Sequence, residues 1–281
     1  MQNNDIEQRI ISQFTKIGFV NLTNIQKQSY SIIRKKKNIL LVAPTGSGKT
    51  EAAIIPIIVE ILNSRPEKNK VSVLYITPLR ALNRDIFERI INYTKLEGLT
   101  TEIRHGDTTR IQKRRMIENP PDVLITTPET LAILVTNKSL RTILSSVKWA
   151  IIDEFHELIG NERGTQLTLS LERLQKLSRN KIVRIGLSAT LGDVNTSLKL
   201  LSGNSNKYLS EAIIDSTVRE YDIEIKYLEG NLVDLSNLIL KYVLKKRKTT
   251  LLFTNTRVEA ESIGSILKVS GSISANTGIA F

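Results

Sequence analysis

Apolar and polar positions along the 281-residue chain alternate in blocks rather than residue by residue. Short, nearly continuous apolar runs rich in Val, Ile and Leu are typical of strands buried on both faces of a parallel sheet. Such runs predict six strands, at residues 38–43, 71–77, 101–105, 123–126, 149–153 and 182–187. Between them lie helical patterns, the clearest at residues 49–63, 79–96 and 166–177. This alternation predicts an α/β fold, a parallel sheet flanked by helices.

A segment rich in Gly, Asn and Ser interrupts this pattern from residue 201 onward. Such a composition indicates a boundary, so we predict a first domain at residues 1–205, a linker at 206–217 and a second unit at 218–281. The second unit has strand patterns at residues 221–228 and 250–254 and helical patterns at residues 232–246 and 258–267. About 60 residues rarely support an independent core, so this unit is interpreted as the beginning of another α/β domain.

Composition narrows the possible chemistry. The chain has no Cys and two His, which excludes disulfides, cysteine nucleophiles and a zinc centre built from histidines. Its net charge of +12 favours nucleic acid as a partner. The polar N-terminus does not resemble a signal peptide, and no apolar run reaches the roughly 18 residues of a membrane span. A cytoplasmic protein without membrane contact is expected.

The strongest motif is APTGSGKT at residues 43–50, which follows a predicted strand and opens a predicted helix. Glycines allow the backbone to turn its N–H groups around phosphate oxygens, and the helix N-terminus adds its dipole. Lys49 is predicted to reach the β- and γ-phosphates and Thr50 to ligate Mg²⁺. The predicted ATP-binding residues of this loop are Pro44, Thr45, Gly46, Ser47, Gly48, Lys49 and Thr50. The alternative is a chance Gly-rich turn with an exposed lysine.

A second motif, WAIIDEFH at residues 149–156, ends an apolar strand in two carboxylates. Asp153 is predicted to hold Mg²⁺ through water, and Glu154 to orient the water that attacks the γ-phosphate. Together with Lys49 these residues form the predicted catalytic set. The alternative is a helix N-terminus that carries acidic residues for its dipole.

The ordered motifs resemble those of superfamily 2 DEAD/DEAH-like helicases. APTGSGKT, TPLRALNRD at 77–85, TTPETL at 126–131, DEFH at 153–156 and SAT at 188–190 are similar to motifs I, Ia, Ib, II and III. HGDTT at 105–109, NPPDVLITTPETL at 119–131 and GNERGTQLTLSLERL after the DEFH box resemble the Lhr-type (large helicase-related) branch in particular. The resemblance covers nearly all of residues 20–257. It implies that the predicted sheet is a RecA-like domain followed by an incomplete second one.

The resemblance also implies roles for isolated residues. Gln26, in LTNIQ, would read the adenine edge, although a lone Gln on a helix is usually just solvated. His156, Ser188 and Thr190 would couple the nucleotide state to the grip on the strand, although Ser and Thr are also ordinary helix caps.

Single-stranded nucleic acid is the partner that the resemblance implies, and we favour DNA over RNA. Loop hydroxyls and Arg side chains would contact phosphate and sugar, and so carry little sequence information. The candidate contacts are Thr77, Pro78, Arg80, Arg104, Thr126, Thr127 and Thr130. Basic clusters at residues 34–37, 113–115 and 245–248 either extend this footprint or are simply solvated.

LLFTNTR at residues 251–257 resembles motif IV, and no later segment of the chain resembles motifs V and VI. Full-length relatives couple ATP hydrolysis to 3′-to-5′ translocation, and the resemblance suggests a role in DNA repair. We therefore expect an ATP-dependent helicase or translocase that uses ATP and Mg²⁺, with low activity in this chain unless a missing C-terminal half is supplied separately. The alternative is a remnant that binds nucleic acid without catalysis.

Overall fold

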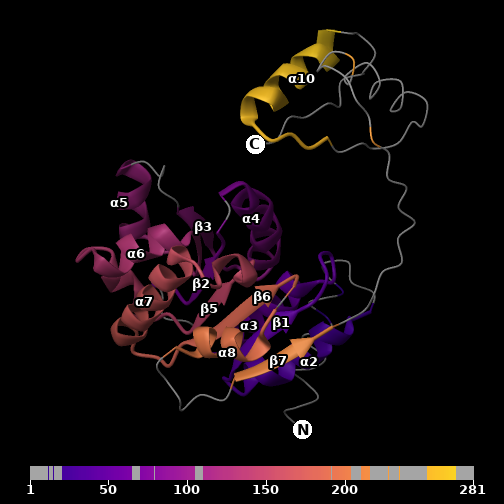
Figure 1. The fold of residues 1–281 in the computed structure, drawn as a ribbon. Coiled ribbons are helices and arrows are strands. Elements are labelled where there is room, and N and C mark those ends of the chain that lie inside the picture. The colour runs from indigo at the N-terminus through magenta and orange to yellow at the C-terminus, as the bar shows by residue number, and fades with distance from the viewer. Residues whose placement is uncertain are drawn as a thin grey trace. The chain divides into compact units, whose positions relative to one another are not determined.

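The computed structural model describes residues 12, 15, 21–64, 70–78, 80–104, 110–190, 192–203, 210–215, 227, 234 and 252–269. The chain divides into two units, Met1–Val218 and Arg219–Phe281. The first unit contains a seven-stranded sheet in the order β3-β4-β2-β5-β6-β1-β7 (Figure 1). All neighbouring strands in this sheet are parallel. The predicted α/β fold with a parallel sheet is confirmed.

The strands of the sheet are short and largely buried. They are β1 (Asn38–Val42), β2 (Val73–Ile76), β3 (Thr101–Arg104), β4 (Val123–Thr126), β5 (Trp149–Ile152), β6 (Val183–Ser188) and β7 (Ser210–Ile214). The first six lie within two residues of the predicted runs. The seventh differs, because β7 falls inside the segment predicted as a linker, 206–217. It pairs with β1 from Asn38↔Ser210 to Val42↔Ile214, so these residues belong to the sheet.

Helices cover both faces of the sheet (Figure 1). They are α2 (Asn24–Arg34), α3 (Lys49–Ser64), α4 (Arg80–Lys95), α5 (Arg110–Glu118), α6 (Pro128–Thr136), α7 (Glu162–Leu177) and α8 (Val194–Ser202), with 3-10 turns η1 (Arg141–Leu144) and η2 (Phe155–Leu158). Alternate strand residues enter two separate cores. Ile39 and Leu41 pack with α2, α3 and α4, whereas Leu40 and Val42 pack with α6, α7 and α8. Burial on both faces explains the continuous apolar runs.

The second unit is described only in part. Its helix α10 (Arg257–Val269) covers the helix predicted at 258–267. Residues 252–254, predicted as the end of a strand, have no regular structure, and Phe253 is 88% exposed. The predictions for 221–228 and 232–246 lie outside the described residues, apart from two isolated positions. Among the described helices, none is long and apolar enough to cross a membrane.

The order of the strands arranges the motifs along one edge of the sheet. Because all strands are parallel, their carboxyl ends lie together, where α/β proteins bind ligands. Across the sheet come the ends of β1, β6 and β5, which carry APTGSGKT, SAT and DEFH, and then those of β2, β4 and β3. The first three ends carry the predicted nucleotide motifs and the next three the predicted nucleic-acid residues.

Candidate functional site

The APTGSGKT loop connects β1 to the first turn of α3 and bends at two glycines. Gly46 and Gly48 have φ values of 76° and 85°, which L-residues rarely adopt. A Cβ added to Gly48 would lie 2.4 Å from Nε2 of Gln26, so a side chain there would displace the end of the Gln26 side chain. Pro44, Thr45 and Ser47 complete the loop, and Oγ of Ser47 is buried with no hydrogen-bond partner among the described residues. The loop therefore presents backbone and helix N-terminus to a ligand, as a phosphate-binding loop requires.

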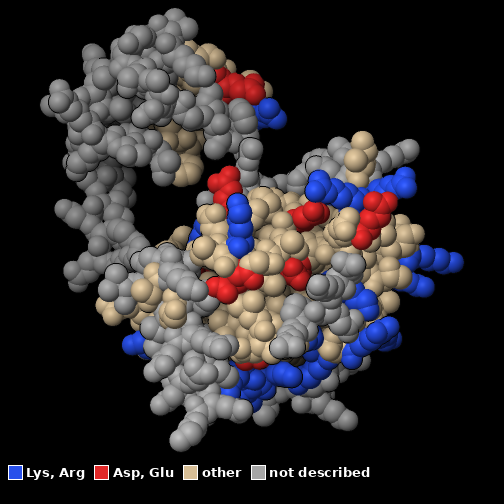
Figure 2. Space-filling model, turned by 180° about the vertical axis from the view of Figure 1, so that it is seen from behind, with Lys and Arg blue, Asp and Glu red and all other residues tan. Residues whose placement is uncertain are grey.

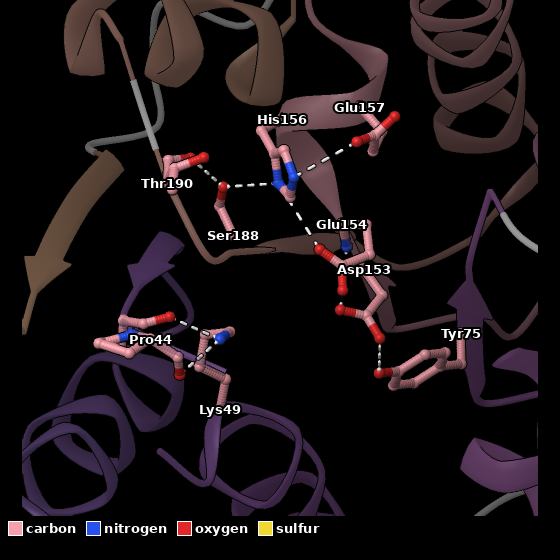
Figure 3. A network of polar contacts seen from close by, with 10 residues as sticks. Pro44, Lys49, Tyr75, Asp153, Glu154, His156, Glu157, Ser188 and Thr190 are labelled. Carbon is pink, nitrogen blue, oxygen red and sulfur yellow. Dashed lines mark hydrogen bonds and ion pairs between the residues drawn. The ribbon is translucent and has the colours of Figure 1, made fainter. Parts of the chain in front are cut away.

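Lys49 is the first residue of α3, and its side chain folds back over the loop (Figure 3). Its Nζ donates to the carbonyls of Ala43 at 2.6 Å and Pro44 at 3.0 Å. An ammonium has three donors, so one remains for a phosphate oxygen. Burial lowers the pKa of Lys49, and the nearby carboxylates of Glu154 and Asp153 oppose this effect. The charges of Glu154 and Asp153 therefore act directly on the Lys49 ammonium group.

Asp153 directly follows β5 and is 8% exposed. Its Oδ2 accepts a hydrogen bond from the Tyr75 hydroxyl at 2.6 Å, and its Oδ1 accepts one from the Glu154 N–H at 2.9 Å. Burial raises the pKa of Asp153, against the opposing effects of these hydrogen bonds and of the Lys49 charge. The two hydrogen bonds therefore orient the carboxylate.

Glu154 has a left-handed backbone, with φ 46° and ψ 46°. This conformation costs a non-glycine residue roughly 1–2 kcal/mol, and such strain is concentrated at functional sites. Burial, and then the charge of Asp153, raise the pKa of the Glu154 carboxyl. A carboxylate with a raised pKa is a better base at neutral pH, which suits the predicted role in orienting water.

The SAT and DEFH motifs are in direct contact (Figure 3). Oγ of Ser188 lies 3.1 Å from Nδ1 of His156 and donates to the main-chain carbonyl of Thr190. His156 also lies 3.6 Å from carboxylate oxygens of Glu154 and Glu157, one on each ring nitrogen. Thr190 thus contributes its backbone to this contact. The arrangement links the end of β6 to the acidic residues.

Gln26 lies on α2, is 1% exposed, and is tied to the phosphate-binding loop. Its Nε2 donates to the Gly48 carbonyl at 3.4 Å, and its Oε1 accepts from the Thr23 N–H at 2.9 Å. The amide therefore joins the helix start to the loop, a role that the sequence did not reveal. One N–H and one lone pair remain for other partners, so recognition of adenine by Gln26 stays a prediction.

The predicted nucleic-acid residues lie at the ends of β2, β3 and β4. Arg104 pairs in register with Thr126, which pairs with Ile76, the residue before Thr77. Oγ1 of Thr77, Oγ1 of Thr126, and Nε and Nη1 of Arg104 are buried without hydrogen-bond partners in the part of the chain that the structure describes. Burial lowers the pKa of Arg104, but a guanidinium remains charged. Unpaired buried polar groups are rare, so this cluster indicates a site for a polar ligand.

The other nucleic-acid candidates differ in their surroundings. Thr127 caps α6: its Oγ1 accepts from the Thr130 N–H at 3.3 Å and donates to the Thr130 hydroxyl at 3.1 Å. The capping role considered for other Ser and Thr residues is therefore fulfilled here. The carbonyl of Pro78 accepts from Arg163 at 2.8 Å. Arg80 begins α4, and its side chain is outside the described set.

Three polar contacts near the site were not predicted from the sequence. Tyr75 is the only hydroxyl-bearing residue within β2, a weak signal that a buried donor has a specific acceptor. Glu51, buried in α3, pairs with Arg89 of α4. Arg163 donates to the Pro78 carbonyl and, at 2.7 Å, to Oε1 of Glu129, and so joins the loop after β2 to the first turn of α6.

Basic side chains of the first unit do not form one continuous stripe on the face shown in Figure 2, but several separate patches with acidic residues between them. Two members of the predicted basic clusters are paired: Lys37 with Glu211, and Arg114 with Glu118 at 2.9 Å. The cluster at residues 245–248 lies outside the described residues. Charge alone therefore does not locate the nucleic-acid site.

The donor groups fit Mg²⁺ bound together with phosphates. Among the described residues, no group of three or more His, Cys, Asp or Glu side chains could hold a metal ion alone. Mg²⁺ keeps several waters and commonly uses one or two carboxylates plus substrate phosphates. Asp153 offers free lone pairs, and the Thr50 hydroxyl interacts with the same phenol that binds Asp153. Thr50 and Asp153 are therefore the candidate Mg²⁺-binding residues.

Comparison with known proteins gives the same picture. Residues 23–197 match the family model described as DEAD/DEAH box helicase. The ATP-dependent helicase Lhr-Core of Sulfolobus acidocaldarius is 37% identical over 274 residues, covering 90% of this chain and 31% of that protein. The structure of Mycobacterium smegmatis helicase Lhr bound to ssDNA and AMP-PNP superposes with a TM-score of 0.79 at 32% identity, covering 94% of this chain and 36% of that one.

The fold extends to more distant structures. The DEAD-box helicase Mss116, bound to ssRNA and UDP-BeF, superposes with a TM-score of 0.76 at 21% identity, covering 92% of this chain and 55% of that one. At that identity the likeness concerns the fold alone. The chain spans about a third of the length of the Lhr-Core relatives that it matches.

Proposed function

Because the chain belongs to the DEAD/DEAH box helicase family and resembles its Lhr-type members, we propose that it is an ATP-dependent helicase or translocase module. It binds Mg·ATP at the ends of β1, β6 and β5, and a single strand of nucleic acid at the ends of β2, β4 and β3. Hydrolysis of ATP is coupled to the hold on the strand through the shared edge of the sheet.

One observation carries the ATP half of this proposal: the glycine loop and the two acids lie together. The charges of Glu154 and Asp153 act on Lys49, although they come from strands separated by β6. Lys49 is partly buried, donates to two carbonyls of its own loop and is acted on by the charges of two carboxylates. The same arrangement suits a triphosphate, whose negative charge would meet the lysine and whose metal would meet the acids.

Each residue then has a defined task. The backbone of Gly46 to Gly48 and the start of α3 bind the phosphates, and Lys49 neutralises the charge on the outer ones. Thr50 and Asp153 would hold Mg²⁺, which when bound would supply positive charge to balance the negative charge of the phosphates. Glu154 orients a water molecule for in-line attack and accepts its proton.

The nucleic-acid half rests on the unpaired groups of Thr77, Arg104 and Thr126. A phosphate or sugar oxygen would satisfy these donors, and a positively charged guanidinium attracts phosphate in particular. We favour single-stranded DNA, because the Lhr relative above 25% identity was solved with ssDNA. Contacts of this kind do not distinguish sequences.

ATP turnover tests the proposal. We would measure it with no nucleic acid, with single-stranded DNA and with single-stranded RNA, for the wild type, Lys49→Ala and Lys138→Ala. Lys138 is exposed in the turn after α6, so its replacement removes an equal charge far from the glycine loop. We expect stimulation by single strands that Lys49→Ala reduces about a hundredfold or more and Lys138→Ala leaves intact.

A different result would favour the alternative given in the sequence analysis, a remnant that binds nucleic acid without catalysis. In that case the wild type would bind single strands while its turnover equalled that of Lys49→Ala. Turnover that is equal for the wild type and Lys49→Ala, without strand binding, would overturn both halves of the proposal.

A further inference from the structure

Tyr75 places a hydroxyl group inside the buried core between the sheet and helices α2, α3 and α4. It lies in β2, has 0% exposure, and packs in the core formed with α2, α3 and α4. Its hydroxyl donates to Oδ2 of Asp153 at 2.6 Å, across the pair of parallel strands β2 and β5 (Figure 3). A Phe would fill the same space without a polar group to desolvate, so the hydroxyl needs an explanation.

We propose that Tyr75 is a positioning residue that orients the Asp153 carboxylate toward Mg·ATP. This inference rests on the function proposed above. Groups that hydrogen-bond to a metal ligand fix the orientation of that ligand. Loss of such a group commonly costs 10- to 100-fold in metal affinity or activity.

The hydrogen bonds of Asp153 leave a free lone pair on each oxygen of its carboxylate. Tyr75 occupies one lone pair of Oδ2, and the Glu154 N–H occupies one of Oδ1 at 2.9 Å. Each oxygen can accept another hydrogen bond, so both can face waters of a bound metal. Rotation of the carboxylate about its terminal bond would break both contacts. Loss of the phenol would leave only the backbone contact from the strained Glu154 to orient it.

The other candidate Mg²⁺-binding residue, Thr50, is the second residue of α3, whereas Asp153 follows β5. Burial and Asp153 raise the pKa of the Tyr75 phenol and the Thr50 hydroxyl lowers it, so both candidate residues act on this one side chain. Tyr75 lies two residues before Thr77, one of the proposed nucleic-acid contacts. The Tyr75–Asp153 hydrogen bond therefore connects the strand that leads to the proposed nucleic-acid site with the proposed magnesium site.

Tyr93 offers a matched control. Its hydroxyl also donates to a carboxylate, Oε1 of Glu51 at 2.9 Å, and it also packs against the core formed with α2, α3 and α4. Tyr93→Phe therefore removes the same atom from a comparable contact, but one that does not involve Asp153. Any effect that is general to losing such a hydroxyl should appear in both variants.

The experiment is equilibrium binding of a fluorescent ATP analogue to the full chain, in excess magnesium and in EDTA. For Tyr75→Phe we expect affinity in magnesium to fall about 10- to 100-fold, with affinity in EDTA unchanged. Tyr93→Phe should bind like the wild type in both. In an Asp153→Ala background, Tyr75→Phe should have no further effect, because the carboxylate through which it acts is absent.

Three outcomes would overturn the inference while leaving the proposed function intact. Tyr75→Phe could bind like Tyr93→Phe, or could lose equal affinity with and without magnesium, which indicates a structural role. Its effect could also persist unchanged in the Asp153→Ala background. By contrast, a wild type whose nucleotide affinity does not depend on magnesium would overturn the proposed function itself.

Discussion

Replacement of Gly48 by Ala tests whether the glycine loop is built as the structure shows. The backbone there has φ +85°, and a Cβ would lie 2.4 Å from Nε2 of Gln26. The left-handed conformation alone costs an alanine roughly 1–2 kcal/mol. Gln26 would also have to move, giving up its bonds to the Gly48 carbonyl and the Thr23 N–H. At about 0.5–1 kcal/mol for each bond, the total is roughly 2–4 kcal/mol.

Gly98 provides the comparison that separates these contributions. It also has a left-handed backbone, at φ +70°, but a Cβ there would meet nothing within 4 Å. Gly98→Ala should therefore lose only the conformational part, roughly 1–2 kcal/mol. The difference between the two variants isolates the clash with Gln26.

Urea unfolding measures both variants through the intrinsic fluorescence of Trp149, the single Trp of the chain, which is buried in β5 of the first unit. We expect Gly48→Ala to lose about 1–2 kcal/mol more free energy of unfolding than Gly98→Ala. Its affinity for Mg·ATP should also fall by about tenfold or more, since displaced N–H groups lose charge-assisted hydrogen bonds. Equal losses of stability, together with unchanged nucleotide binding, would refute this account of the loop.

Two further predictions concern charge. Arg104→Met should raise the free energy of unfolding by about 1–3 kcal/mol, because it removes buried donors without partners. It should also weaken single-strand binding and lower its salt slope by about 1, whereas unchanged affinity would exclude Arg104 from the interface. Because the pKa of Asp153 is raised, magnesium-dependent nucleotide binding should weaken toward acid pH before an ordinary Asp would protonate. The free energy of unfolding changes in the opposite direction. The folded state holds the Asp153 proton more tightly, so folding is favoured as the pH falls through the range between the folded and unfolded pKa values of Asp153. Titration of the wild type against Asp153→Asn checks both the binding effect and the stability effect.

The strands and the turn of the glycine loop were predictable because each is encoded by consecutive residues. Burial on both faces produces apolar runs such as 149–152, and a phosphate-binding turn needs its glycines and lysine within a few positions. Helix starts were less clear. The predicted helix at 166–177 begins four residues earlier, at Glu162, because Asn161 caps it by accepting from the Gly164 N–H at 2.9 Å.

The edge strand β7 was assigned to a linker for a physical reason. Its residues follow a polar stretch and carry no long apolar run, since only one side of the strand pairs with a neighbour. Ile213 is buried, whereas Ile214 is 56% exposed. A short strand of this kind is stabilised by its pairing with β1 rather than by its own composition.

The sequence by itself determined that this chain forms a parallel α/β sheet, and which residues could bind a triphosphate and a metal. It did so because local periodicity and short motifs depend only on neighbours along the chain. Only the tertiary structure decided the strand order, and with it the contacts between residues far apart in sequence. Tyr75 meets Asp153 across 78 positions, and Thr77, Arg104 and Thr126 share one edge. Such pairings depend on which strands lie side by side, a choice made by packing the whole sheet between its helices.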